Sequence, residues 1–178
     1  MRILAISGSL RASSTNTTLL RVAAGLPVSG GRVDLHEGLG ELPHFNPDLD
    51  DLDHGVAPPP VLAFRAELRR SDAVLICSPE YAHGIPGVLK NALDWLVGSG
   101  ELTEKPTLVF IATPTSTLAH QALLEVLRTM GAAVLEAALP TIPGRKKLSE
   151  AEIAASPVFT EPLRAAVERL VAAAAKAP

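Results

Sequence analysis

Short apolar runs alternate along the chain with longer stretches in which apolar residues recur every three or four positions. The runs lie at residues 2–7, 33–35, 73–77, 108–112 and 133–135. Continuous apolar runs of this length are typical of central parallel strands that are buried on both faces. The pattern therefore predicts five strands in one parallel sheet.

The stretches between the runs predict helices at residues 15–25, 61–70, 88–96 and 118–130, and then a helix from 149 that breaks near Pro157 and a last one at 163–176. Ser14 is suited to the N-cap of the first helix, and Gly131 to the C-terminal end of the fourth. Strands and helices alternate without a repeat. This favours a single α/β domain over residues 1–178, with helices on both faces of the sheet.

Right-handed crossovers leave few ways of winding five parallel strands into one sheet. We expect the strand order 2-1-3-4-5, which reverses between the first and third strands. Ligands of open α/β sheets bind at such a reversal, outside the carboxyl ends of the strands. The loops at residues 8–14 and 79–87 follow these two strands, so we expect them to share one crevice.

Composition excludes several classes of protein. Of the 178 residues, 47% are hydrophobic, and the formal net charge of −3 gives no general attraction to nucleic acid or to an anionic membrane. No apolar run approaches the roughly 20 residues of a membrane span. One cysteine allows no internal disulfide and no signal peptide is visible, so the expected location is cytoplasmic.

Residues 38–60 predict a long loop that contains four acidic residues, Asp48, Asp50, Asp51 and Asp53. A calcium loop would need Asp and Asn ligands at fixed spacing and a later bidentate Glu. That spacing is absent, so we expect a solvated loop and no metal site.

Polar side chains gather at the start of the first helix: Ser9, Arg11, Ser13, Ser14, Asn16 and Thr17. Free backbone N–H groups and the helix dipole favour an anion at such a position. The loop has neither the Gly-Lys-Ser/Thr of a P-loop nor the Gly-x-Gly-x-x-Gly of a dinucleotide site. A cradle for one phosphate group is one interpretation, and a polar turn with capping residues is the other.

The loop after the third strand offers a stiff backbone with few ionisable side chains, namely Glu80, Tyr81 and His83. A backbone rim beside one aromatic ring suits a planar heterocycle that is held by amide hydrogen bonds and stacking. The protein would then position a cofactor that carries the reaction, and no side chain is assigned as a catalytic acid or base. His83 is either an exposed loop residue or a proton donor to a reduced quinone.

Two motifs in these loops resemble those of the NAD(P)H-dependent FMN reductases, a family that includes quinone, chromate and azo reductases. They are GSLRxxSxNxxL at residues 8–19, and SPEY followed by IPGxLKNALDW at residues 78–95. The likeness extends in element order to about residue 143.

The resemblance implies a flavodoxin-like three-layer fold, bound FMN, NAD(P)H as co-substrate and a homodimer or tetramer. It implies that hydride passes from NAD(P)H through FMN to a small acceptor (free flavin, quinone, azo compound or metal oxyanion) in a ping-pong sequence. It assigns the FMN phosphate to Ser9, Arg11, Ser14, Asn16 and Thr17, and the flavin ring to Pro79, Glu80, Tyr81, Ala82 and His83. Residues 90–95 resemble the subunit contact of the family.

The sequence departs from the family pattern at Ala82 and Gly84, where members often carry Asn and Ser, and at residues 113–119, which replace a glycine-rich stretch. The second departure motivates an alternative function, a non-catalytic electron carrier or redox-sensing module.

Three further points stay open. Cys77 is expected in the core, Trp95 and Leu96 belong to the core or to a subunit interface, and residues 145–147 form a solvated turn or meet the extra phosphate of NADPH.

Overall fold

The computed structural model describes residues 1–110, 117–135 and 148–177. Its elements are β1 (Arg2–Ser7), α1 (Thr15–Gly25), β2 (Arg32–Leu35), η1 (Leu39–Glu41), η2 (Pro47–Leu49), α2 (Pro59–Arg69), β3 (Ala73–Cys77), α3 (Gly87–Asp94), β4 (Pro106–Phe110), α4 (Thr117–Thr129), β5 (Ala133–Leu135), α5 (Glu150–Ala154) and α6 (Pro157–Ala174). None of the described helices is both long enough and apolar enough to cross a membrane.

The sheet has the order β2-β1-β3-β4-β5, and every neighbouring pair of strands is parallel. This confirms the predicted flavodoxin-like topology. Ser7 pairs with Cys77 in register, so β1 and β3 end side by side where the strand order reverses. The crevice expected at this reversal therefore begins directly after these two residues.

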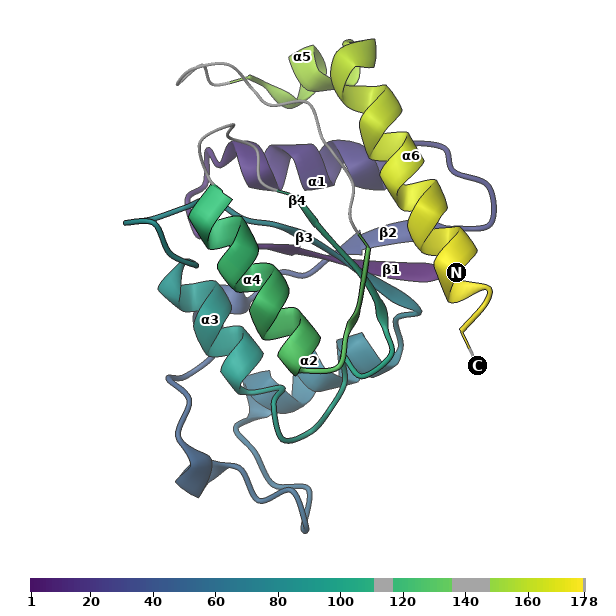
Figure 1. Ribbon diagram of the computed structural model, residues 1–178. Coiled ribbons are helices and arrows are strands. Elements are labelled where there is room, and N and C mark those ends of the chain that lie inside the picture. The colour runs from purple at the N-terminus through teal and green to yellow at the C-terminus, as the bar shows by residue number, and fades with distance from the viewer. Residues whose placement is uncertain (111–116, 136–147, 178) are drawn as a thin grey trace.

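Helices cover both faces of the sheet (Figure 1). Alternate residues of the central strands point to opposite faces, as in any strand. Ile3 and Ala5 pack with α1, α5 and α6, whereas Leu4 and Ile6 pack with α2, α3 and α4. Trp95 and Leu96 are buried on the second face, so both belong to the core of this chain.

Proline positions account for the two largest shifts in where a helix starts. α2 starts at Pro59 rather than at residue 61, because proline at the first helical positions needs no N–H acceptor. For the same reason α6 starts at Pro157 instead of residue 163. β4 begins at Pro106, two residues before the predicted start, and the rest of the predicted strand, residues 111 and 112, lies outside the described residues.

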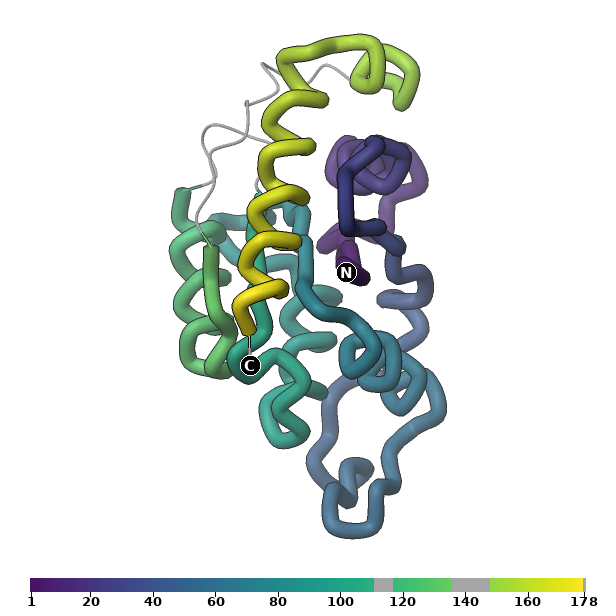
Figure 2. Tube along the Cα trace, turned by 90° about the vertical axis from the view of Figure 1, so that its right-hand side faces the viewer, coloured from purple at the N-terminus to yellow at the C-terminus, as the bar shows by residue number. Residues whose placement is uncertain are grey.

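The long loop between β2 and α2 contains η1 and η2 and extends away from the sheet at the foot of Figure 2. It is held at the end of α3, where the carbonyl oxygen of Pro43 accepts hydrogen bonds from Asn91 Nδ2 at 3.0 Å and Trp95 Nε1 at 2.8 Å. The ring of Phe45 stands edge-on to Trp95, with 5.0 Å between ring centroids. The loop thereby covers the tryptophan from solvent.

Candidate functional site

Gly8 joins the two predicted loops at the carboxyl edge of the sheet. Its N–H donates to the carbonyl oxygen of Cys77 at 2.8 Å. A Cβ atom at Gly8 would lie 2.5 Å from Ser78 Oγ and 3.2 Å from Leu89 Cδ2, so a larger residue would push the loops apart. The loop after β1 and the segment after β3 therefore lie in direct contact at this edge of the sheet.

The start of α1 has the properties of an anion site. Ser14 caps the helix, since its Oγ accepts the N–H of Thr17 at 3.4 Å. The N–H groups of Thr15 and Asn16 have no acceptor in the part of the chain that the structure describes. The first turn contains no acidic side chain. Free N–H groups, a capping hydroxyl with its proton still available and the positive helix end all favour a bound anion.

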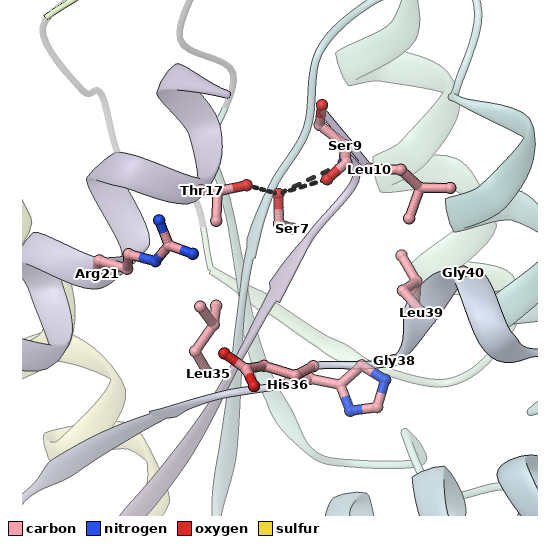
Figure 3. A pocket seen from close by; sticks show the side chains of 11 residues that line it. Ser7, Ser9, Leu10, Thr17, Arg21, Leu35, His36, Gly38, Leu39 and Gly40 are labelled. Carbon is pink, nitrogen blue, oxygen red and sulfur yellow. Dashed lines mark hydrogen bonds between the residues drawn. The ribbon is translucent and has the colours of Figure 1, made fainter. Parts of the chain in front are cut away.

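A cavity of about 140 Å³ lies beside this cradle (Figure 3). It is lined by Ser9 and Thr17 of the predicted phosphate loop, by Leu35 at the end of β2 and by residues 36–40 after it. Thr17 Oγ1 and Ser7 Oγ share a hydrogen bond of 2.7 Å. The guanidinium group of Arg21 lies below these hydroxyls, because residue 21 follows residue 17 by about one helical turn.

Arg11 of the loop and Arg21 of α1 add two positive charges to this part of the chain. Neither Arg11 nor Arg21 makes a side-chain hydrogen bond or salt bridge to any residue that the structure describes. The backbone of Arg11 is fixed by Ser9 Oγ, which accepts its N–H at 3.3 Å, and by the N–H of Ser14, which donates to its carbonyl at 3.0 Å. Unpaired guanidinium groups next to free amides suit a phosphate.

The second loop contains a tight turn with unusual backbone angles. Tyr81 and Gly84 exchange two backbone hydrogen bonds, of 3.1 and 2.9 Å, around Ala82 and His83. Ala82 has φ of 49° and His83 has φ of 60°, the left-handed region at both central positions of a type I′ turn. Strained non-glycine residues of this kind cluster at functional sites.

Glu80 holds this turn to the neighbouring helix. One carboxylate oxygen accepts the N–H of Ala119 at the start of α4 at 3.0 Å, and the other lies 3.1 Å from His83 Nδ1. The carboxylate is therefore occupied on both sides, while the side chains of Tyr81 and His83 are exposed. Of the predicted ring-binding residues, Glu80 thus has its carboxylate engaged within the protein, whereas Tyr81 and His83 are open to solvent.

Cys77 is fully buried at the end of β3, as predicted, and burial raises the pKa of its thiol above the ordinary value of 9.0. Its Sγ–H donates to Asn16 Oδ1 at 3.2 Å, which connects the core to the cradle. The described residues hold no group of three or more His, Cys, Asp or Glu side chains that could bind a metal ion. Two of the loop acids are instead engaged within the protein, Asp50 with Arg65 and Asp51 with His54.

A family model described as NADPH-dependent FMN reductase matches residues 1–176. The chain belongs to this family. The match confirms the family that the two loop motifs predict.

Relatives and solved structures that resemble the chain include named oxidoreductases. The chain is 45% identical over 116 residues to a probable NADPH:quinone oxidoreductase of Oryza sativa subsp. japonica, which covers 63% of this chain and 58% of the relative. It is 42% identical over 95 residues to an NAD(P)H-dependent FMN reductase of Pseudomonas aeruginosa. That alignment covers 53% of this chain and 49% of the relative. These matches span about half the length of the curated relatives.

Among solved structures, the flavoenzyme NAD(P)H:(acceptor) oxidoreductase FerB of Paracoccus denitrificans superimposes with a TM-score of 0.82 at 28% identity. The superposition covers 99% of this chain and 98% of that one. The described part of the chain therefore shares the flavodoxin-like architecture of that flavoenzyme.

Three features of the site were not predicted from the sequence. Arg21 is the first, although its position four residues after Thr17 is a usable signal for a shared helix face. The second is the hydrogen bond of Cys77 to Asn16, which are 61 positions apart in the sequence. The third is that of Ala119 to Glu80, which are 39 positions apart. No local pattern indicates either bond. Residues 113–116 of the third loop and the basic residues 145–147 lie outside the described residues, whereas residues 117–119 of that loop begin α4.

Proposed function

We propose that this protein is an FMN-dependent oxidoreductase that takes hydride from NAD(P)H and passes it to a small acceptor, with a quinone or a free flavin as the favoured substrate. The anion cradle at the start of α1, joined to the second loop at Gly8, carries the proposal. The family and its quinone and flavin reductase relatives support it.

The residues of the cradle fit an FMN phosphate. The N–H groups of Thr15 and Asn16 and the hydroxyl of Ser14 would donate to the phosphate oxygens, and Arg11 would supply positive charge. We add Arg21 to this set, because its guanidinium borders the same cavity and has no partner among the residues that the structure describes. Ser9 and Thr17 complete the polar lining.

The second loop would hold the flavin ring by its backbone and by Tyr81. Bound FMN supplies the ring atoms that accept hydride from NAD(P)H and release it to the acceptor. The protein has no side chain that must act as an acid or base in this scheme, so its contribution is to orient both substrates and to exclude water. Glu80 and the turn of Ala82 and His83 keep the loop in position.

The purified protein should bind FMN, and NADPH or NADH should bleach its visible absorption under anaerobic conditions. Addition of a quinone or free flavin should restore the colour over many turnovers, with parallel lines in double-reciprocal plots. If FMN binds but NAD(P)H does not reduce it without a protein reductase, the alternative of an electron carrier or redox sensor replaces the enzyme. If FMN does not bind, both fail.

We also propose that the protein works as a homodimer or tetramer in the cytoplasm. Glu80 and Ala119 link the second loop to α4. Their neighbours in the sequence, Tyr81 and Leu118, are 57% and 53% exposed. Burial of both next to the site by a second copy would remove this apolar surface from water. Light scattering at micromolar concentration tests the assembly, and a monomer with full turnover would contradict it.

A further inference from the structure

The thiol of Cys77 lies directly beneath the anion cradle. Cys77 ends β3 and is fully buried, whereas Asn16 belongs to the first turn of α1 and is 8% exposed. The thiol donates to the Oδ1 atom of Asn16 at 3.2 Å. This hydrogen bond connects a core side chain of β3 to a polar side chain of the predicted phosphate loop.

The chemistry of the two groups fixes the orientation of the amide. A side-chain amide presents an oxygen that only accepts hydrogen bonds and an NH2 group that only donates them. In the structure the thiol donates to the oxygen, so the Nδ2 group occupies the other edge of the amide. Nδ2 has no hydrogen-bond partner among the described residues, and it is not enclosed as a buried unpaired atom.

We propose that Cys77 is a positioning residue that turns the Asn16 amide so that its NH2 group donates to the phosphate of the bound flavin nucleotide. Without the thiol, the amide is free to rotate and to offer its oxygen, which repels phosphate. The inference rests on the proposed function, since the ligand is a flavin with a phosphate ester. It adds a residue outside the loop to the determinants of phosphate recognition.

A redox or nucleophilic role for this cysteine does not fit its surroundings. The side chain is closed off from solvent, and burial raises the pKa of the thiol, so it stays protonated at neutral pH. Thiolates are the reactive form of cysteine. A thiol that stays protonated can, by contrast, donate a hydrogen bond to Oδ1 of Asn16.

The test compares two ligands that differ only in the phosphate, FMN and riboflavin, bound to the apoprotein and followed by quenching of flavin fluorescence. Cys77→Val and Cys77→Ala remove the donor with opposite changes in volume, and Cys77→Ser keeps a donor. Thr107→Val is the matched control, because it removes a buried hydroxyl from β4 whose one partner among the described residues is the carbonyl of Lys105.

Loss of one neutral hydrogen bond should weaken FMN binding by about 3- to 10-fold in both Cys77→Val and Cys77→Ala. Riboflavin affinity should stay within about twofold of the wild type in every variant, and Cys77→Ser should restore FMN binding. Cys77→Val should have no further effect when Asn16→Ala is already present, because the two residues act as one unit.

Unchanged FMN affinity in Cys77→Val or Cys77→Ala overturns the inference while the proposed function stands. Equal loss of FMN and riboflavin affinity also overturns it, since that pattern indicates general damage to the fold. A wild-type protein that binds neither flavin overturns the proposed function and, with it, this inference. Circular dichroism of each variant confirms that it is folded.

Discussion

Ala82 occupies a backbone conformation that alanine adopts at a cost. Its φ of 49° lies in the left-handed region, where the Cβ atom crowds the following carbonyl oxygen. His83 shares this region, but histidine, like asparagine and aspartate, is several-fold enriched there. Ala82 is therefore the position at which the turn of the second loop is most strained for its residue type.

Ala82→Gly should raise the free energy of unfolding by about 1 kcal/mol, because glycine has no Cβ atom to crowd. Ala82→Asn should give a smaller gain. The control is Ala155→Gly, at an exposed position with φ of −80°, where loss of backbone order should lower stability instead. Urea unfolding measures both, and a destabilised Ala82→Gly would show that the turn is not strained.

Cys77 should also make stability sensitive to alkaline pH. Its folded-state pKa is raised above the unfolded value of 9.0, so the folded protein keeps a proton that the unfolded chain releases. The stabilisation is complete below this value and is lost as the pH rises above it, by about 1.4 kcal/mol per pH unit. Unfolding free energies between pH 8 and 10 should fall more steeply in the wild type than in Cys77→Ala. Parallel curves would contradict this.

At the scale of elements, an ion pair fixes the long loop to the helices below it. Arg65 of α2 is 3% exposed and bonds to both carboxylate oxygens of Asp50, at 2.8 and 2.7 Å. Its Nε also donates to the carbonyl oxygen of Trp95 at 3.1 Å, just after α3. One guanidinium thus connects the loop, α2 and the end of α3.

Asp50→Ala should lower the free energy of unfolding by about 3 kcal/mol, because it leaves a buried guanidinium without its counter-charge. It should also speed proteolysis within residues 42–58. Asp53→Ala is the control, since Asp53 is exposed and has no partner among the described residues, and its effect should stay below about 0.5 kcal/mol. Similar cleavage rates in the two variants would rule out a clamp.

The same elements show what the sequence predicts and what it does not. The cap at Ser14 and the strand order were predictable, because local hydrogen-bonding chemistry and crossover handedness determine them. The link from Glu80 to Ala119 was not, since a carboxylate in a loop carries no sign of which helix end it will meet. The orientation of Asn16 likewise depends on Cys77, 61 residues away, which becomes its neighbour only through the pairing of β1 with β3.

At the scale of the molecule, the sheet connects two separate hydrophobic cores. One lies under α1, α5 and α6, and the other lies under α2, α3 and α4 and contains Trp95, the single tryptophan. Both cores use alternate residues of the same central strands, so unfolding of these strands would disrupt both cores at once. The proposed ligand would bind at the edge where β1 and β3 end, and would thus contact segments that belong to both cores.

Unfolding of the two cores should therefore coincide, and FMN should stabilise both equally. Trp95 fluorescence reports the core of α3, and far-UV circular dichroism reports all helices, including α6 on the opposite face. Their urea midpoints should agree in the apoprotein, as expected for a two-state transition. At FMN 100-fold above its dissociation constant, both should shift by the equivalent of about 2.7 kcal/mol, because only the folded state binds the ligand. If FMN moves the fluorescence midpoint but leaves part of the dichroism signal unshifted, then α6 unfolds independently of the site, and the two cores are not coupled through the sheet.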